Sequence, residues 1–153
     1  MEKHSKHPKG LKTLFFTEMW ERMSYYGMRG ILVLFMTASI LDGGLDFSNA
    51  SASAIYGIYA ASVYLATLPG GWIGDNLFGQ QKTILYGGII IMLGHLSLAI
   101  PNINSFYMGL ILVVIGTGLL KPNISALVGS LYENNTELRQ SGFTIFYMAI
   151  NIG

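Results

Sequence analysis

The chain has 153 residues, of which 52% are hydrophobic and only 11% are charged, with 9 Lys and Arg, 8 Asp and Glu and no Cys. Soluble domains carry about 25% charged residues, so this composition argues against a soluble enzyme and favours an integral membrane protein. The net charge of +1 leaves no basic excess for binding nucleic acid. The absence of Cys excludes disulfides, thiolate catalysis and thiolate metal sites.

The apolar residues are grouped in long stretches separated by short polar segments. After a cytoplasmic tail over residues 1–13, we predict membrane-spanning helices over about residues 14–41, 50–73, 83–100 and 106–132. Each stretch approaches or exceeds the ~20 residues that cross a bilayer core. A fifth stretch begins at about residue 141 and stops at residue 153 without a polar flank, so we expect the sequence to be a fragment.

The segments between these stretches contain turn and capping residues. Ser48 and Asn49 are both suitable N-caps for the second helix. Residues 74–82 predict a short loop and residues 133–140 a longer one. Small residues let membrane helices approach each other closely, and five glycines of the third and fourth stretches are predicted to serve this purpose. They are Gly87, Gly88, Gly94, Gly116 and Gly118.

The distribution of cations predicts the orientation in the membrane. Six of them precede the first stretch or follow the second and the fourth, namely Lys3, Lys6, Lys9, Lys12, Lys82 and Arg139. The segments after the first and third stretches carry no Lys or Arg. Because cytoplasmic loops are enriched in these residues, we predict a cytoplasmic N-terminus in a plasma or inner membrane.

Five charged residues lie inside the predicted spans: Glu18, Glu21, Arg22, Arg29 and Lys121. A charge at the centre of a span costs roughly 2.5–3.5 kcal/mol on insertion scales, so such residues normally face a protein interior or an aqueous cavity. For Glu18, which lies near the cytoplasmic end, an alternative is that its side chain extends to the membrane interface.

Helical spacing places several of these residues on one face of the first helix. Glu18, Arg22, Tyr25 and Arg29 follow each other in steps of four, three and four residues. Glu18 and Arg22 can therefore form a direct i,i+4 ion pair. Packing alone does not explain carboxylates and guanidinium groups between the aromatic residues, so this face is a candidate site.

Depth along the helices predicts where this site lies. At about 1.5 Å per residue, Arg22, Tyr64, Lys121 and Asn151 fall roughly 12–16 Å from the cytoplasmic ends of four different helices, and Arg29 roughly 22 Å. Polar groups near the bilayer midplane are typical of transporters. A channel is the alternative, but its pore normally comes from repeated subunits or re-entrant loops, which the sequence does not indicate.

The same residues resemble the signatures of a known family. Residues 18–27 read EMWERMSYYG, which is similar to the ExxER motif and the following Tyr-Tyr-Gly of the proton-coupled oligopeptide transporters, a branch of the major facilitator superfamily. Residues 71–82, 121–123 and 146–153 resemble further signatures in the same order along the chain. The resemblance extends from about residue 11 to the C-terminus.

This resemblance implies a fold and an activity. The fold would be all-α and integral to the membrane, comprising the first four transmembrane helices and part of the fifth of an N-terminal six-helix bundle. The activity would be proton-coupled symport of di- and tripeptides into the cell by alternating access, without a cofactor, a metal or a catalytic residue. The remaining C-terminal part would be needed to close the cavity, so we do not expect the fragment alone to transport.

The resemblance also implies roles for individual residues. Proton coupling falls to Glu18, Glu21 and Arg22. Peptide binding falls to Arg22, Tyr25, Tyr26, Arg29, Tyr64, Lys121 and Asn151. Asp75 and Lys82 would act at the cytoplasmic gate, unless they merely cap helices. Animal members carry a proton-handling His where this chain has Gly57, so coupling would depend on carboxylates.

Two other classes of function stay open. A relative of the family could move another small solute, such as nitrate or a drug. An intramembrane enzyme could use Glu18 and Glu21 as acid and base, although no nucleophile or metal cluster supports that interpretation.

Overall fold

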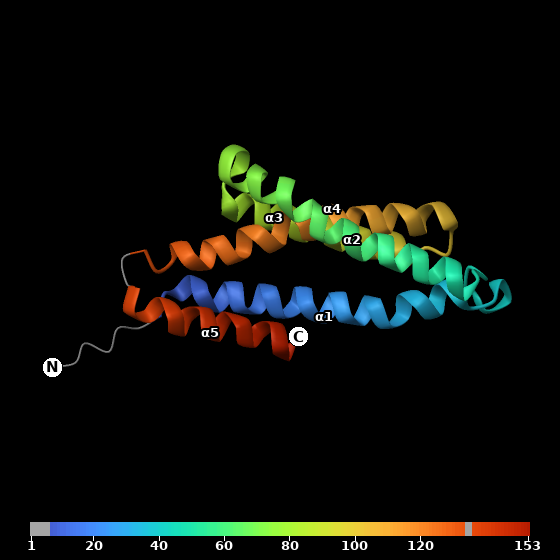
Figure 1. Ribbon diagram of the computed structural model, residues 1–153, viewed down its shortest axis with the longest axis horizontal. Helices are drawn as coiled ribbons and strands as arrows, with labels where there is room; N and C mark the ends of the chain where they lie inside the picture. Colours follow the sequence, from blue (N-terminus) through green and yellow to red (C-terminus); the bar gives the residue numbers. More distant parts are fainter. Residues whose placement is uncertain (1–6, 134–135) are drawn as a thin grey trace. The chain divides into compact units, whose positions relative to one another are not determined.

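The computed structural model describes residues 7–133 and 136–153, whose regular structure is entirely helical (Figure 1). The elements are α1 (Lys9–Thr37), a 3₁₀ helix (Ile40–Asp42), α2 (Asn49–Ile73), a π-helix (Gly74–Phe78), α3 (Gln80–Leu98), α4 (Ile103–Ser130) and α5 (Thr136–Ile152). The predicted all-α class is thereby confirmed. Residues 1–6 of the predicted tail, with Lys3 and Lys6, lie outside the described residues.

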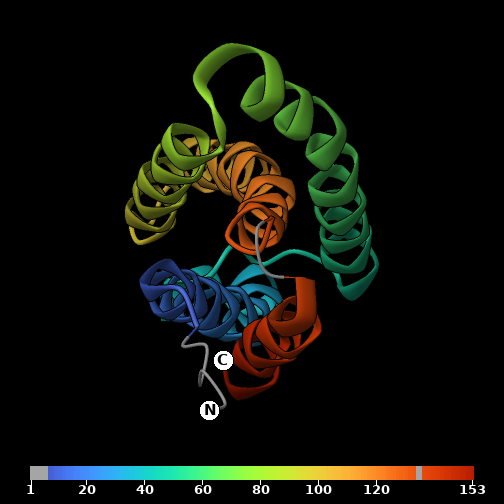
Figure 2. The same cartoon turned by 90° about the vertical axis from the view of Figure 1, so that its left-hand side faces the viewer.

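The chain forms two compact units. The first comprises Met1–Met28 and Ile124–Gly153, and the second comprises Arg29–Asn123. In the first unit, α5 lies beside the N-terminal part of α1 (Figures 1 and 2). The second unit contains α2, α3, the C-terminal part of α1 and most of α4.

The ends of the first helix differ from those predicted. α1 begins at Lys9, so the last five residues of the predicted tail 1–13 are helical, because backbone hydrogen bonding continues beyond the apolar stretch. α1 ends at Thr37 rather than at residue 41. There the hydroxyl of Ser39 accepts a hydrogen bond from the N–H of Leu41 over 3.2 Å, and Gly43 adopts a left-handed conformation at φ 82°. These local bonds replace the last predicted turn of α1 with a 3₁₀ turn.

The prediction of a loop over residues 74–82 is wrong. The chain continues from α2 into the π-helix Gly74–Phe78 and then directly into α3, with Gly79 at φ 79° as the break. Helical hydrogen bonds thus satisfy backbone polar groups that a loop would leave to other partners. Of the two candidate caps of α2, Ser48 is the N-cap, because its Oγ accepts a hydrogen bond from the N–H of Ser51 at 3.2 Å. The loop predicted over residues 133–140 is also shorter than expected, because α5 starts at Thr136.

Glycines bring the helices of the second unit into close contact. A Cβ added to Gly87 of α3 would lie 2.7 Å from the carbonyl oxygen of Gly116 on α4, and a Cβ on Gly116 would meet the carbonyl of Gly87 at the same distance. Gly94 contacts Val113, and Gly118 contacts Ala66 of α2. These four glycines confirm the predicted role in helix packing.

Gly88 does not share this role. A Cβ added there would meet no atom within 4 Å. Gly88 follows Gly87 directly, so its Cα faces roughly 100° further round the helix and away from α4.

This difference between Gly87 and Gly88 predicts that the same substitution affects stability differently at the two positions. Gly87→Val is expected to lower the free energy of unfolding by about 1–3 kcal/mol, because the added methyl groups overlap backbone atoms of α4. Gly88→Val is expected to leave stability nearly unchanged, since the added side chain meets open space. Thermal unfolding of the purified protein in detergent checks both, and an equal loss for the two variants would contradict the packing described here.

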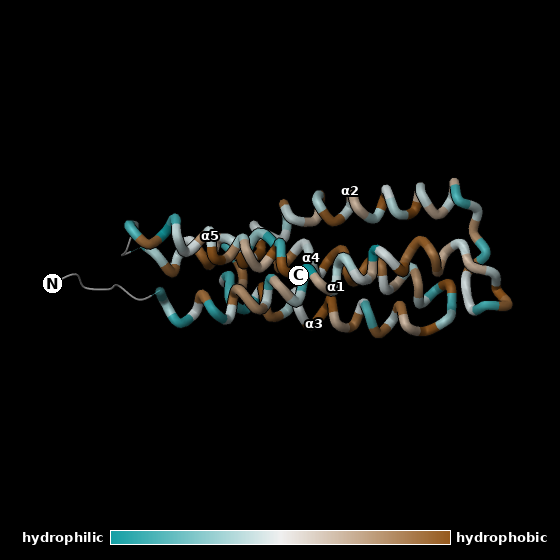
Figure 3. Tube along the Cα trace, turned by 90° about the horizontal axis from the view of Figure 1, so that it is seen from below, coloured by the Kyte–Doolittle hydropathy of each residue, from teal (hydrophilic) through white to brown (hydrophobic). Residues whose placement is uncertain are grey.

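In the described part of the chain, two helices are long and apolar enough to cross a membrane. They are α2 with its π-helical extension, over Asn49–Phe78, and α4, over Ile103–Ser130. Figure 3 shows apolar residues along the helices and hydrophilic first turns of α1 and α5. Large apolar side chains such as Leu34 and Leu68 are exposed, which suits contact with lipid or with further protein. The number of membrane crossings stays a prediction.

Candidate functional site

The predicted site residues divide between the two units. The first unit contains Glu18, Glu21, Arg22, Tyr25, Tyr26 and Asn151. The second contains Arg29, Tyr64, Asp75, Lys82 and Lys121. Their convergence on one cavity therefore stays a prediction, and each group has its own local geometry.

In the first unit, Arg22 binds both carboxylates of the predicted cluster. Its Nε lies 3.1 Å from Oε1 of Glu18 and 2.9 Å from Oε2 of Glu21. The first of these contacts is the expected i,i+4 ion pair, which the helix geometry of α1 provides directly. We call these three residues the charge cluster.

The charge cluster is buried. The side chains of Glu18, Glu21 and Arg22 are 4%, 5% and 11% exposed. The alternative in which Glu18 extends to the membrane interface therefore does not fit the structure. Two carboxylates thus share one guanidinium in a buried place, where charged groups need paired and hydrogen-bonded partners.

One oxygen of Glu18 lacks a hydrogen-bond donor among the described residues. Oε2 of Glu18 is buried and accepts no hydrogen bond from any residue that the structure describes. Buried polar atoms are nearly always hydrogen-bonded, so a buried oxygen without a donor requires a physical explanation. Burying this oxygen as a bare anion is costly, and the ion pair of Oε1 with Arg22 offsets that cost.

Aromatic residues extend the cluster along α1. The guanidinium carbon of Arg22 lies 5.5 Å from the centre of the Tyr25 ring, a cation–π distance. The rings of Tyr25 and Tyr26 meet edge to face, and Tyr26 is exposed. Within the first unit, the buried charged residues of α1 are therefore followed along the helix by aromatic residues, of which Tyr26 is exposed.

Asn151 lies on the turn of α5 that packs near the cluster. The end of α5 approaches α1 so closely that a Cβ on Gly153 would lie 3.0 Å from Cβ of Arg22. The side chain of Asn151 is exposed, and its Nδ2 donates a hydrogen bond to the carbonyl of Tyr147 in the same helix, over 3.1 Å.

In the second unit, Arg29 pairs with a residue that sequence reasoning missed. Its guanidinium carbon lies 5.5 Å from the centre of the Tyr56 ring, which belongs to α2. Tyr64, also on α2, is exposed. The sequence signal for Tyr56 is weak, because an aromatic residue in a membrane helix is common, and only packing shows that it meets a cation.

Lys121 is half-buried on α4 and is followed by Pro122 and Asn123. Asn123 is a second residue to which the sequence analysis gave no role in the site. It is 1% exposed, and its Nδ2 donates to the carbonyl oxygens of Gly70 at 2.9 Å and of Leu119 at 2.7 Å. An amide in the middle of an apolar helix was the available signal for it.

The two predicted gating residues are exposed and separate. Asp75 belongs to the π-helix and Lys82 to the first turn of α3. In the described part of the chain no ion pair joins them, and neither helix has a side-chain cap hydrogen bond. The alternative that these residues cap helices is therefore not supported, and the gating role stays a prediction.

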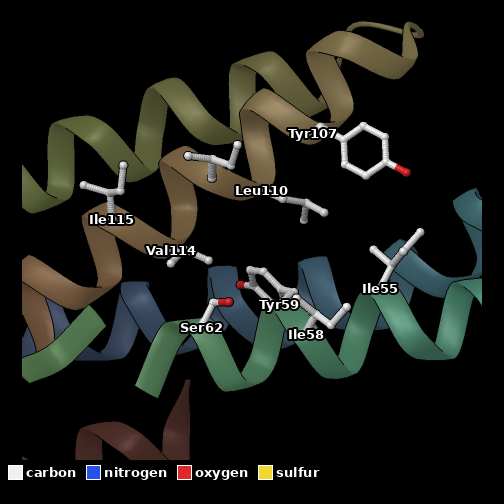
Figure 4. Close-up of a pocket in the computed structure, with 9 residues that line it drawn as sticks. Ile55, Ile58, Tyr59, Ser62, Tyr107, Leu110, Val114 and Ile115 are labelled. Atoms are coloured by element: carbon white, nitrogen blue, oxygen red, sulfur yellow. The ribbon is translucent and has the colours of Figure 1, made fainter. Parts of the chain in front are cut away.

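An apolar cavity of about 290 Å³ lies between α2 and α4 (Figure 4). Its polar groups are the hydroxyls of Tyr59, Ser62 and Tyr107, and the other lining residues are aliphatic. None of the predicted site residues lines it, and it carries no charge, so it does not suit a zwitterion. Among the described residues, no group of three or more His, Asp or Glu is placed to hold a metal ion.

Comparison of the sequence with known proteins gives consistent matches. A family model described as "PTR2: POT family" matches residues 81–153. The chain is 53% identical over 148 residues to the "Uncharacterized transporter YclF" of Bacillus subtilis (strain 168), covering 96% of this chain and 30% of that protein. It is 51% identical over 149 residues to the "Di-/tripeptide transporter" of Lactococcus lactis subsp. lactis (strain IL1403), covering 95% and 30%.

The fold matches solved structures as well. A crystal structure of the peptide transporter POT in complex with sulfate superposes with a TM-score of 0.92 at 49% sequence identity, covering 99% of this chain and 31% of that one. The chain thus spans about 30% of the length of the curated relatives that it matches.

Proposed function

This chain belongs to the POT family, and from that premise we propose that it is part of a proton-coupled symporter that moves di- and tripeptides into the cell by alternating access. The Lactococcus relative, 51% identical, is a di-/tripeptide transporter by name. The observation that carries the proposal is the buried charge cluster, in which Glu18 and Glu21 compete for Arg22.

The residues proposed for peptide binding suit the two oppositely charged ends of a peptide zwitterion. The planar fork of Arg22 matches a carboxylate, while Lys121 acts as a point charge, and both would hold the C-terminal end of the peptide. Asn151 would accept the amino end. Tyr25, Tyr26, Arg29 and Tyr64 would line the remainder of the pocket.

Coupling follows from competition for the same cations. A peptide carboxylate and the Glu21 carboxylate would both bind Arg22 or Lys121, so protonation of Glu21 would free a cation for the peptide. Release of the proton from Glu21 into the cytoplasm would restore the ion pair of Glu21 with Arg22 and displace the peptide. The sharing of one guanidinium by two buried carboxylates supports this exchange.

The proposal extends to topology. Residues 14–153 would supply the first four crossings and part of the fifth of an N-terminal six-helix bundle, with the N-terminus in the cytoplasm of the plasma or inner membrane. The rest of the transporter would complete the cavity around a site at the bilayer midplane. Transport therefore requires the complete protein, and vesicles carrying only this segment are expected to accumulate no peptide.

The test uses the complete reading frame that contains this segment, purified into liposomes. Labelled dialanine is expected to accumulate when an inward proton gradient is imposed and to equilibrate without accumulation when it is not. Excess unlabelled dialanine should abolish the signal, and excess nitrate should not. Competition by nitrate, or folded protein without dialanine uptake, would overturn the peptide assignment in favour of another solute.

A further inference from the structure

Asn123, which the proposed mechanism does not use, joins two helices of the second unit. Its Nδ2 donates across the interface to the carbonyl of Gly70 on α2, over 2.9 Å, and also to the carbonyl of Leu119 within α4. The side chain is almost completely buried. The amide thus anchors α4 to α2 at one level along both helices.

The helices are weakened by proline at this level. Pro122 in α4 and Pro69 in α2 have no N–H, so the carbonyls of Gly118 and Leu65 lose their usual helical donors. The carbonyl of Gly118 instead lies against Gly70, where no side chain would fit. A helix with an interrupted hydrogen-bond ladder bends and rotates more easily. The backbone alone therefore does not hold α4 rigidly near Lys121.

The anchor also contacts the π-helix. The side-chain oxygen of Asn123 occupies the space in which a Cβ of Gly74 would lie. Gly74 is the first residue of the π-helix that contains Asp75. A movement of the π-helix would therefore press directly on Asn123.

Lys121 lies two residues before Asn123 in the same helix. Two residues correspond to a rotation of roughly 200° about the helix axis, so the two side chains leave α4 on nearly opposite sides. Asn123 faces α2, and Lys121 accordingly faces away from α2. Fixing the amide against α2 fixes the direction of the Lys121 side chain.

We propose that Asn123 is a positioning residue for the substrate site, which holds Lys121 in its binding direction by anchoring α4 to Gly70 of α2 and to Gly74 of the π-helix. This inference rests on the proposed function, in which Lys121 binds the peptide carboxylate. It predicts that loss of the Asn123 hydrogen bonds weakens peptide binding only in protein that still has Lys121.

The test measures dialanine uptake by the complete protein with Asn123→Ala and Asn123→Leu. The leucine variant keeps the volume of the amide without its hydrogen bonds, so it tests the same anchor if the alanine variant does not fold. Each is expected to raise KM about three- to tenfold, as the loss of one hydrogen bond would, with kcat within about twofold. In a Lys121→Gln background the same substitutions should change KM no further.

Ser97→Ala is the matched control. Ser97 Oγ donates to the carbonyl of Ser105 over 2.8 Å and so also joins a neighbouring helix to α4, at its other end. Its loss is expected to leave KM unchanged. An unchanged KM in both Asn123 variants, or effects of Asn123 and Lys121 that simply add, would overturn the inference. Absence of dialanine uptake by the wild-type protein would instead overturn the proposed function.

Discussion

Replacement of Glu21 by Gln is expected to uncouple peptide movement from the proton gradient. The neutral amide cannot take up or release a proton, so Glu21 no longer competes with the peptide carboxylate for a cation in a way that depends on pH. Proton-driven dialanine uptake should fall about tenfold or more, a typical magnitude for the loss of coupling between two sites. Exchange of labelled for unlabelled peptide without a gradient should continue, because the peptide site itself is kept.

The control for this prediction is Glu137→Gln. Glu137 is an exposed carboxylate in the first turn of α5 and belongs to the same unit. It should retain both uptake and exchange. If Glu21→Gln left uptake and its dependence on external pH intact, the proton-coupling role of the charge cluster would be refuted.

Replacement of Lys121 by Gln is expected to weaken binding of the free peptide carboxylate. A hydrogen bond to a charged group contributes about 1.5–3 kcal/mol, so KM for dialanine should rise by about tenfold or more. Lys12→Gln, which removes an exposed lysine of α1, should leave KM unchanged.

A competitor separates this role from a general loss of structure. Dialanine amide lacks the negative charge of the free acid, so wild-type protein should bind it less well than dialanine. In the Lys121→Gln variant the two competitors should inhibit uptake more equally. A preference for the free acid that is the same in both proteins would show that Lys121 does not contact the carboxylate.

The sequence alone was sufficient for features that depend on neighbours along the chain. The helical class follows from long apolar stretches, and the ion pair between Glu18 and Arg22 follows from the four-residue spacing. Ser48 as the N-cap of α2 depends on a hydrogen bond to a backbone group three residues away. Such features are recoverable because helix geometry determines which near neighbours meet.

Features that depend on contacts between helices were not recoverable in this way. Gly87 and Gly88 are identical in sequence terms, yet only the first lies against α4. Tyr56 becomes notable only where packing places it against Arg29. The π-helix Gly74–Phe78 replaced a predicted loop, since turn-forming residues such as Gly74 and Asn76 do not exclude continued i→i+5 hydrogen bonding.

The sequence by itself therefore determined that this protein is helical and that two carboxylates and an arginine lie together within two turns of α1, because a helix brings residues three and four apart to one face. Only the tertiary structure decided that these charges are buried and that Asn123 anchors α4 to α2. Burial and cross-helix hydrogen bonds depend on which faces of distant segments pack together. The spacing of residues along one helix does not determine this packing.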